Sequence, residues 1–121
     1  MTRRSPHERL PRQGGLGMDR ETSVTVQRFA AALRRQMNLD GLILFGSRAR
    51  GDHFVTSDFD FVVVSRDFSG TRFSTRAARL YDLWPSRYDL EALCYTPEEW
   101  RRLKDKRAIL INAQREGIRL V

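Results

Sequence analysis

The chain has 121 residues, enough for one domain. Apolar residues make up 40% and charged residues 31%, which excludes a wholly disordered chain. The formal net charge is +7, from 22 basic and 15 acidic residues. No apolar run approaches the roughly 18 residues of a membrane span, and no apolar core of a secretory signal follows the start. The single cysteine, Cys94, excludes an internal disulfide and suits a reducing compartment, so we expect a cytoplasmic protein.

The first 18 residues differ from the rest in composition. They combine prolines and glycines with four arginines and one acid, which leaves 18 basic and 14 acidic residues for the remainder. A segment with so few apolar side chains gains too little from burial to offset the entropy of ordering it. We expect a disordered basic tail over residues 1–18 and one mildly basic domain over residues 19–121. Because the domain is only mildly basic, nucleic acid is not expected as a direct partner.

Hydrophobic spacing predicts the secondary structure in chain order. Apolar residues recur at helical intervals over residues 23–37, which predicts a covering helix. An apolar run at 42–45 predicts a first strand, and alternation over 58–64 predicts a second. Helical spacing returns over 73–84, and strand alternation follows over 88–95.

The last part of the chain opens with a helix signal. Thr96, Pro97 and Glu99 match an N-cap, a first helical position and the third position of a capping box. A third helix is expected from there to just before Gly117, with a short final strand over residues 118–121. The resulting order predicts an α/β (α+β) fold, a mixed β-sheet with helices packed on it.

The most informative stretch covers residues 42–65. The first strand stops at Gly46 and Ser47, ten residues follow, and then Asp58 and Asp60 alternate with apolar residues. Alternate strand residues share a face, so the two carboxylates project together from Cα atoms about 6.5 to 7 Å apart. Such a pair can share two Mg²⁺ ions. Glycine lets a backbone approach a ligand closely, and N–H groups that open a helix favour phosphate.

This composite pattern resembles the nucleotidyltransferase superfamily of the DNA polymerase beta type. The sequence GSRARG after the first strand is similar to that of the minimal nucleotidyltransferases, and the resemblance covers about residues 22–121. It implies a polymerase-beta-like core, ATP as substrate and two Mg²⁺ ions. It further implies that Asp58 and Asp60 are catalytic metal ligands and that Gly46 and Ser47 bind the nucleotide.

The resemblance also implies a third carboxylate on the strand after the intervening helix. Asp89 and Glu91 both qualify, and strand alternation places them on one face. We favour Glu91 as the third catalytic and metal-binding acid, because relatives of this kind carry theirs five residues before such a helix start. Asp89 is the alternative.

Two arginines follow the Gly-Ser turn. Arg48 and Arg50 could neutralise charge on the bound phosphates. The alternative for each is a salt bridge to Asp52 or another surface acid. His53 lacks a metal-ligand partner at useful spacing in the sequence and is expected at the surface.

The acceptor of the nucleotide is argued from the small size of the domain. A core of this size leaves little surface to hold an acceptor, so we expect a second chain, either another copy in a homo-oligomer or a different partner. The resemblance implies a HEPN-domain partner, a ribonuclease toxin that the enzyme neutralises by adding AMP to a tyrosine. The alternatives are a non-catalytic module that masks a helical partner and a nucleotidyltransferase acting on a small molecule.

Overall fold

The computed structural model describes residues 18–54 and 57–121. It has the predicted fold class, a mixed sheet with helices packed on it. The tail predicted over residues 1–18 lies outside the described residues except for Met18, whose side chain is buried in the core. The elements in chain order are α1 (Arg20–Gln36), β1 (Leu39–Phe45), α2 (Ser47–Arg50), β2 (Phe59–Ser65), η1 (Arg66–Phe68), α3 (Phe73–Arg76), α4 (Ala78–Tyr81), β3 (Leu90–Tyr95), α5 (Pro97–Leu103), α6 (Ala108–Glu116) and β4 (Ile118–Arg119).

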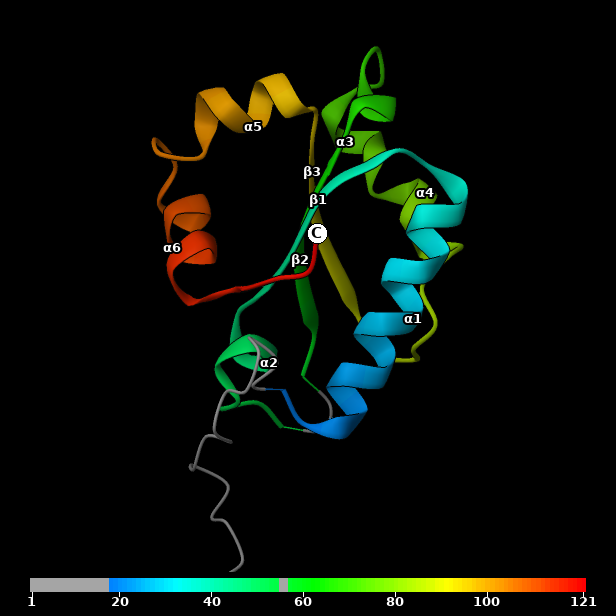
Figure 1. The fold of residues 1–121 in the computed structure, drawn as a ribbon, viewed down its shortest axis with the longest axis vertical. Coiled ribbons are helices and arrows are strands. Elements are labelled where there is room, and N and C mark those ends of the chain that lie inside the picture. The colour runs from blue at the N-terminus through cyan, green and yellow to red at the C-terminus, as the bar shows by residue number, and fades with distance from the viewer. Residues whose placement is uncertain (1–17, 55–56) are drawn as a thin grey trace, which may run out of the picture.

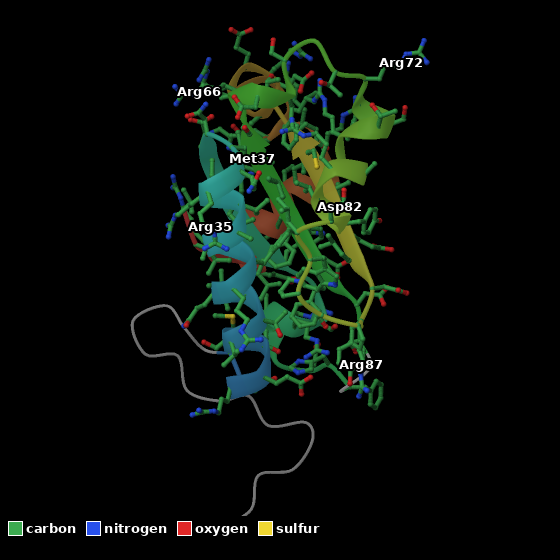
Figure 2. All side chains as sticks on the ribbon, turned by 90° about the vertical axis from the view of Figure 1, so that its right-hand side faces the viewer. Arg35, Met37, Arg66, Arg72, Asp82 and Arg87 are labelled. Carbon is green, nitrogen blue, oxygen red and sulfur yellow. The ribbon has the colours of Figure 1, made fainter. Side chains whose placement is uncertain are left out.

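The four strands form one sheet in the order β3-β2-β1-β4. β1 runs antiparallel to β2 and β4, whereas β2 and β3 run parallel. A parallel pair needs a crossover, which η1, α3 and α4 provide. In Figure 2, Arg87 just before β3 lies at the opposite end of the molecule from Arg66 just after β2. The two parallel strands therefore begin at the same end of the sheet.

Helices cover both faces of the sheet. Figure 1 shows α1 and α4 on one side of the strands and α5 and α6 on the other. The α1 side holds the larger core, with Phe29 against Phe61 at 5.1 Å between ring centroids. The other side holds a smaller core that includes Val62, Tyr95 and Leu110. Strand alternation places the three predicted carboxylates on this second side, beyond the part of the sheet where the smaller core lies.

Two predicted boundaries near the start of the sheet shift in the structure. The first helix begins three residues earlier than predicted, because Asp19 caps it by accepting the backbone N–H of Thr22 at 2.7 Å. The first strand starts at Leu39 instead of residue 42. Asp40 is held there by the backbone N–H of Arg66 at 2.9 Å, and the pairing with β2 is irregular at this point.

The helix predicted over residues 73–84 is wrong as a single element. The chain forms the two short helices α3 and α4, and only part of the predicted apolar face is buried. Phe73 and Tyr81 are exposed, at 45% and 54%. Arg76, the last residue of α3, is buried instead, and it donates to the backbone oxygens of Thr71 and Cys94 and to the Glu99 carboxylate.

The predicted third helix is also divided. The capping box of Thr96 and Glu99 is confirmed, and the final strand forms, although it is shorter than predicted. Between α5 and α6 the chain turns, with the N–H groups of Lys106 and Arg107 both donating to the Leu103 oxygen. Arg107 then adopts an extended conformation, which lets α6 turn back and pack on β1. No helix among the described residues is both long and apolar enough to cross a membrane.

Candidate active site

The turn after β1 is shaped by Gly46. Its φ of 75° and ψ of −159° lie in a region that side chains strongly disfavour. A Cβ atom at this position would also stand 2.4 Å from Oδ2 of Asp60 on the neighbouring strand. Only glycine lets the turn and the carboxylate lie side by side. The short helix α2 follows at once, and its Ala49 and Arg50 N–H groups donate to the Gly46 oxygen. Ser47 is partly exposed at its start.

Asp60 and Glu91 face each other across the parallel strands β2 and β3. Burial raises the pKa of Asp60 to about 7, with further contributions from a hydrogen bond to the Glu91 side chain and from the charges of Glu91 and Asp58. Arg50 acts in the opposite direction. Without a metal, the pKa of Asp60 therefore lies far above the ordinary range of an aspartate. This carboxylate cluster concentrates negative charge where a cation would relieve it.

The second strand begins at Phe59, one residue later than predicted, so Asp58 lies just before it. The Asp58 side chain is exposed. Of the two candidates for the third acid, Glu91 is the one that the strand register places against Asp60. Asp89 lies just before β3 and is exposed, and its backbone oxygen accepts the N–H of Phe59 at 2.9 Å. The metal-binding role of Glu91 stays a prediction, but Glu91 has the contact with Asp60 that this role needs.

The donor set fits a hard divalent cation in its chemistry. Asp58, Asp60 and Glu91 offer only carboxylate oxygens, the ligands that Mg²⁺ prefers in proteins. Within the described residues, no three His, Cys, Asp or Glu side chains already converge as a metal site. The Asp60–Glu91 pair is formed and Asp58 is its neighbour, so a metal would require the Asp58 side chain to turn toward the pair.

The two arginines of α2 have different surroundings. Arg50 is partly exposed and forms ion pairs with Asp52 at 3.1 Å and with Glu116 at 3.6 Å. For Arg50 the structure thus contains the predicted alternative, a bridge to Asp52. A weak exposed pair can rearrange, so its contact with phosphate stays a prediction. Arg48 is buried, and its guanidinium donates to the Thr22 hydroxyl and to the Ser57 backbone oxygen. The phosphate contact of Arg48 also stays a prediction.

The expectation for His53 is wrong. Its side chain is only 11% exposed, and its Nε2 lies 2.5 Å from the Asp19 carboxylate at the start of α1. The sequence carries no local signal that a histidine 34 positions after Asp19 packs against it. This contact between distant segments places His53 at the start of α1.

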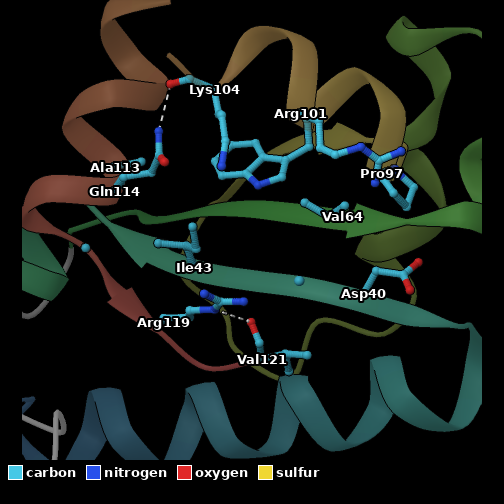
Figure 3. A pocket seen from close by; sticks show the side chains of 13 residues that line it. Asp40, Ile43, Val64, Pro97, Arg101, Lys104, Ala113, Gln114, Arg119 and Val121 are labelled. Atoms are coloured by element: carbon cyan, nitrogen blue, oxygen red, sulfur yellow. Dashed lines mark hydrogen bonds between the residues drawn. The ribbon is translucent and has the colours of Figure 1, made fainter.

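A separate cavity of about 580 Å³ lies between β1, α5 and α6. Its lining includes Trp100. Figure 3 shows the cationic side chains of Arg101, Lys104 and Arg119 among its walls. Arg119 donates to the Val121 oxygen, and the Lys104 backbone oxygen accepts the Gln114 side chain. Within the described chain, its lining includes none of the residues predicted for the nucleotidyltransferase site. The cavity and the carboxylates are therefore two different places on the same side of the sheet.

The comparison with protein families agrees with the motif. Residues 26–115 match the family model described as nucleotidyltransferase domain. Among solved structures, the chain is similar to a "putative nucleotidyltransferase" from Sulfolobus solfataricus, with 27% identity over 70% of this chain and 73% of the other, and a TM-score of 0.47. A search of curated proteins found no match.

Proposed function

The chain belongs to the nucleotidyltransferase domain family, and on this premise we propose that it transfers AMP from ATP to a protein hydroxyl in a Mg²⁺-dependent reaction. The observation that carries the proposal is the close contact of Gly46 with the Asp60–Glu91 pair, a contact that only a glycine permits. A backbone turn suited to phosphate and a cluster of acids suited to metal thus lie within one side-chain length of each other.

Asp58, Asp60 and Glu91 would hold the metal. When bound, Mg²⁺ neutralises charge on the triphosphate and lowers the pKa of the acceptor hydroxyl. Asp60 binds a metal ion only when deprotonated, so its raised pKa makes binding weaker below about pH 7. Glu91 keeps Asp60 in position from the neighbouring strand, and the buried Phe59 and Phe61 on either side of Asp60 fix the strand.

Gly46 and Ser47 would hold the triphosphate. With glycine at 46 the backbone can come close to phosphate oxygens, and the Ser47 hydroxyl can donate to one of them. The acceptor oxygen forms a bond with the α-phosphorus, and the bond from this phosphorus to the bridging oxygen of the β-phosphate breaks. Pyrophosphate leaves, and the hydroxyl proton passes to solvent.

We propose a tyrosine of a HEPN-type ribonuclease toxin as the acceptor, which would make this chain an antitoxin. The exposure of Asp58 and Glu91 supports a protein acceptor, because a side chain on another molecule can reach these acids from solvent. The identity of the partner rests on the resemblance of the GSRARG turn to minimal nucleotidyltransferases.

The reaction type is tested by labelling ATP at different phosphates. The purified chain is incubated with Mg²⁺, a purified HEPN-domain ribonuclease toxin, and ATP labelled at the α- or the γ-phosphate. We expect the α-label on the partner and the γ-label in released pyrophosphate. Retention of the γ-label on the partner would indicate phosphoryl transfer and contradict the proposal. A stable complex with no label would favour a masking module.

A further inference from the structure

Arg48 is a buried cation whose guanidinium contacts Ser57 and Phe59, the two residues that flank Asp58 in the sequence. Only 1% of the residue is exposed, and burial lowers the pKa of the guanidinium. A charge in such a place needs compensating partners. Its carbon Cζ lies 4.2 Å from the centre of the Phe59 ring, and its Nε and Nη2 donate to the Ser57 backbone oxygen at 3.3 and 3.2 Å.

These contacts link the Gly-Ser turn to the segment that carries Asp58. Arg48 stands two positions after Gly46, and Ser57 and Phe59 are the residues on either side of Asp58. The Phe59 ring faces the larger core, on the opposite side of the sheet from the carboxylates. The Arg48 guanidinium thus contacts the start of β2 from the side of the sheet opposite the carboxylates, while the Asp58 side chain is exposed.

The same guanidinium reaches two further segments. Nη1 donates to the Thr22 hydroxyl in α1 at 3.0 Å, and the Tyr88 ring before β3 lies 5.6 Å away. The pair of His53 with Asp19 ties the loop ahead of Asp58 to the same end of α1. Arg48 therefore lies where four segments meet, and three of them lead directly into predicted site residues.

We propose that Arg48 is a positioning residue that fixes Asp58 relative to the Gly46 turn by holding the Ser57 carbonyl. This inference rests on the proposed function, because it concerns the metal that Asp58 would bind. A displacement of about 1 Å is enough to impair a preorganised site. Arg48 thus acts through the backbone on the side of the sheet away from the substrate.

The test is metal affinity. Binding of Mn²⁺ in the presence of a non-hydrolysable ATP analogue is measured by titration calorimetry for wild type, Arg48→Met, Arg48→Lys and Thr22→Val. Methionine keeps the length of the side chain but donates no hydrogen bond, whereas lysine keeps the charge and one donor group. Thr22→Val is the matched control, since it removes the Thr22 hydroxyl from the same buried network and leaves the bonds to Ser57.

We expect Arg48→Met to lower Mn²⁺ affinity at least tenfold and Arg48→Lys to recover part of the loss. Thr22→Val should stay within twofold of wild type even though its melting temperature falls. If Arg48 acts only on Asp58, affinity for the analogue in EDTA stays nearly unchanged in all four proteins, whereas a loss in EDTA would point to the predicted phosphate contact instead. Folded Arg48→Met with wild-type Mn²⁺ affinity, or a loss that appears equally in EDTA, would overturn the inference.

If Arg48→Met does not fold, amide hydrogen exchange of Arg48→Lys decides. We expect at least tenfold faster exchange in residues 57–60 and unchanged exchange in the middle of α1. Equal exchange at residues 57–60 in wild type and Arg48→Lys would overturn the inference. If wild type fails to bind Mn²⁺ even with the nucleotide analogue, the proposed function itself fails, and that result is distinct from an unchanged Arg48 variant.

Discussion

Gly46 and Asp60 lie so close that a Cβ atom on Gly46 would stand 2.4 Å from the Asp60 carboxylate. We predict that Gly46→Ala displaces Asp60 and lowers nucleotidyl transfer at least about 100-fold, roughly 2.7 kcal/mol in transition-state free energy. Gly70→Ala is the matched control. Its φ of 81° is also positive, but nothing lies within 4 Å of the added atom.

Both variants should lose stability, by about 1 to 2 kcal/mol each from the positive φ. Thermal unfolding and transfer rates are measured on both. If Gly70→Ala loses as much transfer activity as Gly46→Ala, the contact with Asp60 is not the cause.

The raised pKa of Asp60 gives metal-free protein a characteristic pH dependence. The folded pKa of about 7 exceeds the ordinary 3.8, so the folded state holds the proton more tightly than the unfolded state. This contribution to the free energy of unfolding is present below about pH 4 and is lost as the pH rises toward 7. We predict that in Asp60→Asn the free energy of unfolding decreases less as the pH rises. The metal-free melting temperature at pH 8 should then be higher than that of wild type by about 5 °C, roughly 1 kcal/mol.

Asp105→Asn is the control, since Asp105 is an exposed acid in the turn between α5 and α6. Melting in EDTA is followed from pH 4 to pH 8. A wild-type slope that survives unchanged in Asp60→Asn would show that another group produces it.

Glu99 should give a pH dependence of opposite sign. Its hydrogen bond to Arg76 is the largest of the effects that lower its pKa from 4.5 to about 2. Its stabilising contribution is therefore present above about pH 4.5 and is lost as the pH falls toward 2. We predict that Glu99→Gln melts several degrees below wild type at pH 7 and that the two converge near pH 2. Glu98→Gln, an exposed neighbour, should follow wild type at every pH, and parallel curves for wild type and Glu99→Gln would count against the Arg76 contact.

The register of β2 and β3 predicts which acid completes the site. Glu91→Gln should reduce transfer at least about 100-fold, roughly 2.7 kcal/mol, whereas Asp89→Asn should cost less than tenfold. The reason is that Glu91 lies opposite Asp60, while Asp89 lies two residues away. Initial rates at saturating ATP and Mg²⁺ check the order, and the reverse order would assign the third ligand to Asp89.

Local patterns in the sequence predicted much of the fold and the centre of the site. Period-two alternation placed Asp58 and Asp60 on one face, and the capping box marked the start of α5. The Gly46 turn was predictable because glycine after an apolar strand has a specific backbone use. Strand alternation alone put both Asp89 and Glu91 on that face, and only the pairing with β2 separates them.

Contacts between distant segments were not predictable from local patterns. Arg76, where α3 ends, turns inward to meet Glu99, 23 positions away. Helical spacing continued across residues 104–107, where the chain turns so that α6 can pack on β1. The contacts of the Arg48 guanidinium with Phe59 and Ser57 were not predictable either, and its predicted phosphate contact stays a prediction. A single sequence shows the charge of such residues but not the buried partners that hold them.

The most direct test of nucleotidyl transfer is the intact mass of the partner protein. A HEPN-domain ribonuclease toxin, the proposed partner, is incubated with ATP and Mg²⁺ and with wild type, Asp58→Asn or Asp60→Asn, after both variants are shown to melt cooperatively. We predict a gain of one or more AMP units on a tyrosine of the partner with wild type, and no gain with either variant or in EDTA. An unmodified partner with folded, metal-loaded wild type, or equal modification by all three proteins, would contradict the account.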